Sequence, residues 1–532
     1  MTKDKFFGRR EQLNILLKRI GDLKDGYRQN IAILGDELVG KTSLIYKLLG
    51  TLWDNRTIVL YLEVRPQALE SFAKRYMSVL FYNFLSNSGI TLREDLVFLI
   101  SKSERFIPRT AAKARSILSS LEKRKTSDIF PVLLSLPDLI HQETGKFCVV
   151  ILDEFHNLEK MGIKKLYAEW SKLLILHKST MYVIISSMKF RAQQVLARNL
   201  SLLFGNFEVI NIEPFDVKIS EDYLNNHFRE RGMAVNKGMI NFIVHFTGGY
   251  PFYLETISRQ LTNPGIEGLV DALEELLFSS AGMLNQRFSH YLKRFLDLPQ
   301  SRDFIEVLYL ISNGHNKLRD ISHILHRQQK DLRFKVGQMV ELDMISRNGD
   351  FLKINDRVFS FWLKFVYQEK AHAFTFDAKS QKELFREKIF SMVKEFVTAE
   401  QKPISERLIE LLRLFDDDMV QLDRKKIRLS HFREIKPLEL NGRFLKDGII
   451  GRSSENVWIM GLKKEAITEE DIVDFSRECK KYRHGEQKKI IITLKDIDMN
   501  TRLKALNDKV ITWDVNILNQ ILDLFAKPRI IV

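Results

Sequence analysis

Apolar positions along this 532-residue chain follow two patterns. Short, nearly continuous apolar runs, typical of buried strands, occupy 57–64, 147–154 and 181–187, and a run from residue 31 leads through glycines into an amphipathic stretch. The stretches between these runs carry apolar residues every three or four positions, as helices do. Strands that alternate with helices predict an α/β fold with a parallel sheet, which binds its ligands at the carboxyl ends of the strands.

Changes in this pattern divide the chain into four expected domains. The sheet occupies 1–215 and includes a mostly helical insertion at 68–145. Helical periodicity interrupted by a glycine-rich turn predicts a small helical lid at 216–298. Helices followed by a hairpin, the order of a winged helix, are expected at 299–370. Polar helices followed by alternating strands and helices predict a separate α/β domain at 371–532.

The loop after the first strand has the residues that a triphosphate needs. Gly35 to Thr42 fit G-x-x-x-x-G-K-[ST] between a strand and a helix, the context that this P-loop motif requires. Main-chain N–H groups would surround the phosphate oxygens, Lys41 would contact the outer phosphates, and Thr42 would ligate Mg²⁺. The alternative is a chance strand, turn and helix with a lysine. The residues expected to bind nucleotide are Gly35, Asp36, Glu37, Leu38, Val39, Gly40, Lys41, Thr42 and Ser43.

An acidic pair ends the apolar run at 147–154. Asp153 would organise Mg²⁺, and Glu154 would polarise the attacking water as a general base. Acids at this place also cap helices, which is an equally good interpretation of the pair alone. Together with the P-loop, the pair favours catalysis.

Polar residues follow the strand at 181–187. Ser187, after Ser186, would hold the attacking water or sense the terminal phosphate, although serine at a strand end is also a common turn former. Lys189, Arg191 and Arg198 are candidates to stabilise charge that develops during hydrolysis, and Arg198 is included in the predicted catalytic set. The alternative is that these cations are exposed and solvated.

These residues together resemble the archaeal-type P-loop ATPases, a branch of the ASCE-type P-loop NTPases close to the AAA+ and STAND families. The resemblance covers roughly residues 5–370 and rests also on FFGRREQL at 6–13 and TGGYPFYL at 247–254. It implies that the nucleotide is ATP rather than GTP. It further places Phe7, Gly8 and Arg9 against the base, and Tyr250 and Pro251 near the nucleotide.

One position departs from the family pattern. Relatives often carry an arginine directly after the glycine that corresponds to Gly205, whereas this chain has Asn206. The resemblance therefore does not supply an arginine finger there, and hydrolysis is expected to be slow or to depend on a partner.

The last domain is similar to restriction-endonuclease folds, whose metal site needs an Asp followed by Glu-x-Lys. Asp447 and Lys463 match this pattern, but Gly461 stands where the glutamate should be. Because a hard cation needs several oxygen ligands, nuclease activity is not expected. Glu455 or Glu465 would have to replace the missing ligand.

Charge points to a polyanionic partner. The net charge is +15, and basic residues are denser at 105–124, 319–338, 424–428 and 480–489, which favours DNA binding through phosphate contacts.

Two cysteines support neither a disulfide framework nor a cysteine-rich metal site. No apolar stretch reaches the roughly 18 to 20 residues of a membrane span, and the first residues lack a signal-peptide core, so the expected location is the cytoplasm.

Three functions remain open at this point. The first is a DNA-associated ATPase whose nucleotide state controls how basic C-terminal modules engage DNA. The second is a STAND-like signalling or protein-assembly switch that forms homo-oligomers or binds protein partners. The third is a nucleotide-binding scaffold without hydrolysis, which an intact Glu154 argues against.

Overall fold

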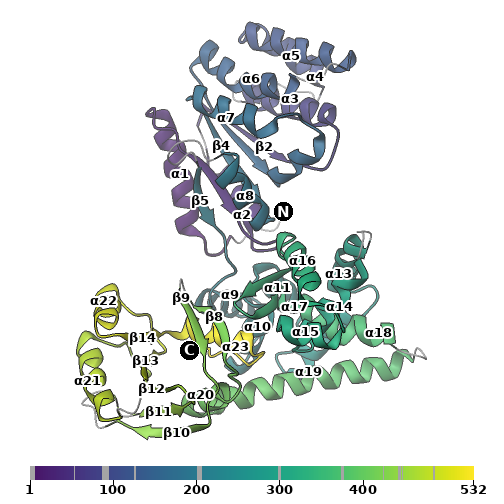
Figure 1. Cartoon of the computed structure of the whole chain (residues 1–532). Coiled ribbons are helices and arrows are strands. Elements are labelled where there is room, and N and C mark those ends of the chain that lie inside the picture. Colours follow the sequence, from purple (N-terminus) through teal and green to yellow (C-terminus); the bar gives the residue numbers. More distant parts are fainter. Residues whose placement is uncertain are drawn as a thin grey trace. The chain divides into compact units, whose positions relative to one another are not determined.

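The computed structural model divides the chain into two compact units (Figure 1). The first comprises Met1–Phe215, Tyr250–Phe252 and Glu341–Asp343. The second comprises Asp216–Gly249, Tyr253–Val340 and Met344–Val532. The structure describes residues 6–52, 54–86, 95–124, 128–200, 207–296, 301–372, 377–422, 425–440, 445, 447–482 and 486–531.

A five-stranded parallel sheet forms the centre of the first unit, as the sequence predicts. Its strand order is β2-β3-β4-β1-β5. Because β1 lies between β4 and β5, the carboxyl end of β1 is at the point where the chain changes direction across the sheet, a common place for ligands. The strands are β1 (Asn30–Leu34), β2 (Thr57–Glu63), β3 (Phe147–Asp153), β4 (Thr180–Ser186) and β5 (Phe207–Asn211).

Helices cover this sheet. The predicted insertion forms α3, α4, α5 and α6, and it shares one continuous apolar core with the strands, in which Tyr76, Trp170 and Tyr182 are fully buried. The insertion is therefore part of the core packing of the first unit. The helices of this unit are α1 (Arg10–Lys24), α2 (Lys41–Thr51), α3 (Leu69–Ser86), α4 (Leu96–Ser103), α5 (Pro108–Glu122), α6 (Ile129–Thr144), the 3₁₀-helix η1 (Phe155–Met161), α7 (Leu166–Leu176) and α8 (Lys189–Arg198).

The second unit begins with helices and a hairpin. Three helices, α14, α15 and α16, precede the hairpin β6–β7, the order expected for residues 299–370. The elements are α9 (Val217–Glu230), α10 (Lys237–Thr247), α11 (Pro251–Gln260), α12 (Ile266–Leu273), η2 (Glu274–Phe278), α13 (Met283–Leu296), α14 (Ser301–Ser312), α15 (Leu318–Ile324), α16 (Gln329–Glu341), β6 (Ile345–Asn348), β7 (Phe351–Ile354), α17 (Arg357–Trp362), η3 (Leu363–Tyr367) and α18 (Gln368–His372).

A second five-stranded sheet, in the order β10-β11-β12-β13-β14, forms the remainder of this unit. The first three strands are antiparallel and the last three are parallel. The elements are α19 (Ala378–Gln401), α20 (Ile404–Leu412), β8 (Asp418–Leu422), β9 (Lys425–Leu429), β10 (Glu434–Glu439), β11 (Asp447–Arg452), β12 (Asn456–Lys463), α21 (Glu469–Cys479), η4 (Lys480–Tyr482), β13 (Glu486–Thr493), α22 (Met499–Asn507), β14 (Val510–Trp513) and α23 (Val515–Leu524).

The turn of the β6–β7 hairpin is attached to β8. The main-chain N–H of Asp350 donates to the carbonyl of Met419 at 2.9 Å, and the Asn348 amide exchanges two hydrogen bonds with the main chain of Gln421. At Gly349, with φ of +61°, an added Cβ would lie 1.9 Å from the Met419 oxygen. Only glycine permits this close approach.

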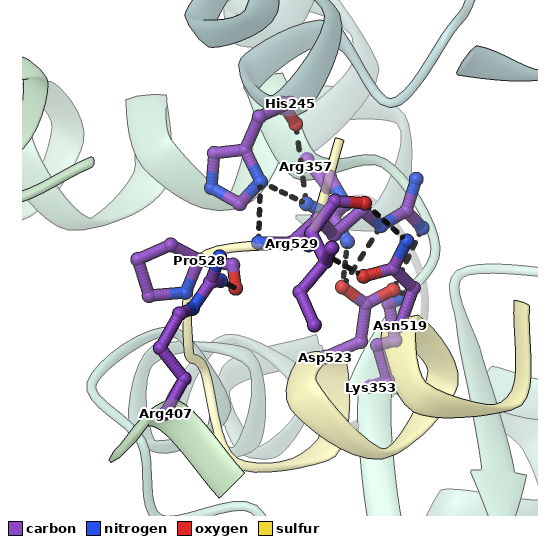
Figure 2. Close-up of polar contacts among 9 residues, drawn as sticks. His245, Lys353, Arg357, Arg407, Asn519, Asp523, Pro528 and Arg529 are labelled. Carbon is purple, nitrogen blue, oxygen red and sulfur yellow. Dashed lines mark hydrogen bonds and ion pairs between the residues drawn. The ribbon is translucent and has the colours of Figure 1, made fainter. Parts of the chain in front are cut away.

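A buried carboxylate joins several segments of the second unit (Figure 2). Asp523 on α23 is 5% exposed and accepts from Lys353 Nζ at 2.8 Å and from Arg529 Nη2 at 2.7 Å, and Arg357 bonds its other oxygen. Burial alone would raise the pKa of Asp523, but Arg357, Lys353 and Arg529 hold it well below its usual range. Asp523 therefore stays ionised between three cations.

The C-terminal segment continues this network (Figure 2). Arg407 donates to the Pro528 carbonyl at 2.6 Å, and Asn519 exchanges hydrogen bonds with the main chain of Ile530. The Nδ1 of His245 on α10 faces the main-chain N–H of Arg529 at 3.4 Å. Burial lowers the pKa of His245 well below its ordinary value, and nearby arginines lower it further, so the ring is neutral.

No helix among the described residues combines the length and the apolar character needed to cross a bilayer.

Cys148 and Cys479, the two cysteines of the sequence, are both buried free thiols. Burial raises the pKa of Cys148 and raises that of Cys479 to about 12. Both thiols are therefore protonated at neutral pH.

Candidate active site

The P-loop joins the end of β1 to the start of α2, as the motif predicts. Leu38 and Gly40 have positive φ angles of 69° and 91°. Left-handed residues in a loop are typical of backbone concavities in which successive N–H groups bind an anion. At Gly35 an added Cβ would lie 2.4 Å from the carbonyl oxygen of Ile212. The first glycine of the motif is therefore required by packing.

Lys41 is folded back on its own loop. The side chain is buried, and Nζ donates to the carbonyls of Gly35 at 2.9 Å and Asp36 at 2.7 Å. Burial lowers the pKa of Lys41, and the charges of Glu154 and Asp153 oppose that effect. Its amine therefore lies close to both acids at the end of β3.

Asp153 meets Thr42 at the carboxyl edge of the sheet. The Thr42 hydroxyl donates to Asp153 Oδ2 at 3.2 Å, and the Tyr61 hydroxyl donates to the same oxygen at 2.9 Å. Burial raises the pKa of Asp153, as does Glu154, while Tyr61, Lys41 and Thr42 oppose the rise. Tyr61 was not identified from the sequence, although it lies in the predicted strand that pairs with β3.

Glu154 is held by the neighbouring strand end rather than by a helix. Its Oε2 accepts from the main-chain N–H of Ser187 at 3.0 Å and from the Ser187 hydroxyl at 2.8 Å. Its side chain makes no capping hydrogen bond to η1, so the helix-cap alternative does not describe this acid. The strand end thus brings the two predicted catalytic residues together.

His156 was also not identified from the sequence. Its Nδ1 lies 2.9 Å from Ser186 Oγ and 3.3 Å from Glu154 Oε2. Burial lowers the pKa of His156 to about 4, so the ring is neutral at pH 7.

The three candidate cations of α8 have different surroundings. Lys189 Nζ lies 3.1 Å from both carboxylate oxygens of Asp36. Arg191 forms an ion pair with Glu159 at 2.9 Å. Arg198 is exposed at the far end of the helix, about 13 Å from Lys189 along the axis, so its predicted catalytic role rests on the sequence. Gly205 and Asn206 lie outside the described residues.

The amino-terminal element FFGRREQL contacts Phe215, which lies a few residues after β5. Phe7 meets Phe215 edge to face with ring centroids 6.3 Å apart, and the Arg9 guanidinium lies 4.9 Å from the centre of the Phe215 ring. Gly8 and Arg9 have positive φ angles.

Tyr250 and Pro251 belong to the same compact unit as the P-loop. The Tyr250 hydroxyl donates to Asp36 Oδ2 at 3.1 Å, and Pro251 is the first residue of α11.

The candidate nuclease residues of the last domain have other partners. Lys463 Nζ forms an ion pair at 2.7 Å with Asp471, a fully buried acid that caps α21. Glu455 pairs with Arg428 at 2.9 Å. Asp447 begins β11 and is exposed. No group of three or more metal-binding side chains occurs in the part of the chain that the structure describes.

Comparison with known proteins gives one family match. Residues 6–257 match the model of a family described as an ATPase domain predominantly from Archaea. No curated protein matches the chain. The parallel sheet, its phosphate-binding loop and this match define a P-loop ATPase domain.

Several solved structures are similar over most of their length. A Walker-type ATPase of Pyrococcus abyssi is 19% identical, with a TM-score of 0.49 over 68% of this chain and 97% of that chain. The Aeropyrum pernix ORC2 protein, solved in ADPNP–ADP complexes, is 10% identical, with a TM-score of 0.42 over 74% and 96%. The Aeropyrum pernix ORC1 protein, solved with DNA, is 13% identical, with a TM-score of 0.35 over 68% and 93%.

Proposed function

We propose that this chain binds ATP with Mg²⁺ and hydrolyses it to ADP and phosphate. The observation that carries the proposal is the 3.2 Å hydrogen bond between Thr42 and Asp153, which lie 111 positions apart in the sequence. Lys41 lies beside them and bonds the loop carbonyls through its amine. Three residues with the chemistry of a nucleotide site therefore converge where a P-loop sheet binds phosphate.

The oxygen ligands fit a magnesium ion. A hydroxyl and a carboxylate that share one hydrogen bond are hard donors, and Mg²⁺ is usually held by one or two protein oxygens together with substrate phosphates. Thr42 and Asp153 would hold the ion, which would offset charge on the phosphates. When the nucleotide binds, the Lys41 amine would leave the two loop carbonyls and donate to the outer phosphates instead.

Glu154 is the proposed general base. Ser187 fixes the orientation of its carboxylate with two hydrogen bonds, and neutral His156 stands beside it. A carboxylate whose position is fixed in this way can accept a proton from water as the terminal phosphate is attacked.

Lys41→Ala is expected to weaken ATP binding by about 100-fold, because several charge-assisted contacts to phosphate are lost together. Titration with a fluorescent ATP analogue in the presence of Mg²⁺ measures this directly. Lys47→Ala removes an exposed lysine from the same helix and is the matched control, which should bind as the parent does. Equal affinity in Lys41→Ala and the parent would refute the nucleotide site.

We further propose that nucleotide state controls how the basic C-terminal modules engage DNA, and that residues 299–370 form a winged helix. Not all the basic residues predicted there are available. Arg319 pairs with Asp416, and Arg327 and Lys335 both pair with Asp303. Lys330 and Arg333 on α16 are exposed and form no ion pair with a described residue. These two cations, beside the exposed Phe334, are the proposed phosphate contacts.

The double variant Lys330→Ala/Arg333→Ala is expected to bind duplex DNA more weakly and with a shallower salt dependence, by about two in the slope of log K against log salt. Filter binding across a salt series measures both quantities. Lys218→Ala/Lys237→Ala removes the same charge from α9 and α10 and should leave the slope nearly unchanged. Absence of DNA binding by the parent at low salt would favour a protein partner.

One observation favours the alternative, a STAND-like protein-assembly switch. Met499, Leu503 and Leu506 are 71%, 53% and 53% exposed and follow one face of α22. A contiguous exposed apolar patch often marks a protein contact. A homo-oligomer or another protein would then be the partner that responds to ATP.

For the last domain we propose a binding role without nuclease activity. The lysine that matches the nuclease pattern is engaged by Asp471, and the position of the metal-binding glutamate is occupied by Gly461. An added Cβ at Gly461 would approach the Phe475 ring to 3.0 Å, so the core packing itself favours glycine there.

A further inference from the structure

A second lysine lies at the mouth of the P-loop. Lys189 is the first residue of α8, and its ammonium lies 3.1 Å from each carboxylate oxygen of Asp36, the second residue of the loop. Both side chains are largely covered, at 25% and 17% exposure. This ion pair therefore belongs to the site rather than to the solvated surface.

Asp36 is held from two sides by lysines. Lys41 donates to its main-chain carbonyl, and Lys189 pairs with its carboxylate. Glu213 also lies 4.0 Å from Lys189. Burial on its own would lower the pKa of Lys189, but Asp36 and Glu213 raise it above its usual value. The amine is thus a full cation at neutral pH.

A bound triphosphate is expected to break the ion pair between Lys189 and Asp36. The carboxylate of Asp36, at the second position of the loop, would lie beside the phosphates of a bound nucleotide. The two negative charges would repel each other. A lysine ammonium has three donors on a flexible stem and can change partners at little cost in geometry. The terminal phosphate group of ATP carries more negative charge than the Asp36 carboxylate, so it would compete for this ammonium.

Resting on the proposed ATPase function, we propose that Lys189 binds the terminal phosphate of ATP, and that Asp36 holds it in place until the nucleotide arrives. Of the three basic residues of α8 that the sequence singles out, Arg191 is engaged by Glu159 and Arg198 lies at the other end of the helix. Lys189 then supplies the charge that an arginine finger supplies in other P-loop ATPases. It discriminates ATP from ADP because only ATP carries that phosphate.

Affinities for AMP-PNP and ADP, measured by calorimetry with Mg²⁺ on the full chain, test this assignment. Lys189→Ala is expected to weaken AMP-PNP about 10- to 100-fold, the loss of one hydrogen bond to a charged group, and to change ADP affinity less than threefold. Lys189→Arg should retain most of the preference for AMP-PNP. Lys47→Ala, which removes an exposed lysine of α2, is the control and should bind both nucleotides as the parent does.

Combining Lys189→Ala with Asp36→Asn distinguishes two roles of Lys189: binding the terminal phosphate, or only neutralising the Asp36 carboxylate. If Lys189 binds phosphate, Asp36→Asn/Lys189→Ala binds AMP-PNP as weakly as Lys189→Ala alone. If Lys189 only cancels the charge of Asp36, the double variant recovers parental affinity, and the proposal is overturned. Equal losses for AMP-PNP and ADP in Lys189→Ala would also overturn it. A parent chain that binds neither nucleotide would instead contradict the proposed ATPase function.

Discussion

Replacing Glu154 with Gln leaves ATP bound and lowers its turnover by about 100- to 1000-fold, the size of effect expected for loss of a general base. The amide keeps the shape of the side chain and can still accept from Ser187, so the loop and its nucleotide stay in place. Phosphate release at saturating ATP measures turnover, and a fluorescent analogue measures binding.

The control for this variant is Glu159→Gln. Glu159 lies on η1, the 3₁₀-helix that begins directly after Glu154, and it bonds Tyr167 and Arg191. The Glu159→Gln variant should therefore hydrolyse ATP at nearly the parental rate. Undiminished turnover in Glu154→Gln would assign the base to another group, and weaker binding would mean that the carboxylate holds the nucleotide rather than the water.

Replacing Asp523 with Ala is expected to cost the second unit about 3–5 kcal/mol of unfolding free energy, because a buried ionic network loses the carboxylate that compensates three cations. Lys353, Arg357 and Arg529 would then repel one another in a poorly solvated space. Urea unfolding followed by tryptophan fluorescence reports the change, since Trp458 and Trp513 lie in this unit's core.

Asp508→Ala provides the comparison for this variant. Asp508 follows α22 and pairs with a partly exposed lysine, Lys504, at 3.6 Å, so its loss should cost less than about 1 kcal/mol.

Because the pKa of Asp523 lies well below its usual range, the contribution of Asp523 to the free energy of unfolding is complete above about pH 4 and disappears on stronger acidification. Identical urea midpoints for Asp523→Ala and the parent would show that the network does not stabilise the fold.

The parallel sheet and the central chemistry of the site could be predicted from sequence because both are local. Apolar runs define the strands, and the P-loop and the pair Asp153 and Glu154 stand directly after two of them. Parallel strands end at one edge, so Thr42 and Asp153 were expected to meet, and they do.

Contacts between distant segments could not be predicted in the same way. Lys353 and Asp523 are 170 positions apart, and no periodicity relates a strand residue to a helix near the end of the chain. The same holds for the attachment of Asn348 to Gln421, which determines what covers the hairpin turn. Lys463 matched a nuclease pattern by spacing, yet its partner Asp471 depends on how α21 packs.

The two protonated, buried thiols have a practical consequence. Cys148 and Cys479 should resist maleimide at neutral pH, because the thiolate is the reactive form. Single cysteines introduced at Tyr27 in the first unit and at Met499 in the second, both more than two-thirds exposed, would therefore be the only labelled positions. Energy transfer between a donor and an acceptor dye on that pair would test, one molecule at a time, whether ATP binding or hydrolysis changes the distance between the two labelled positions.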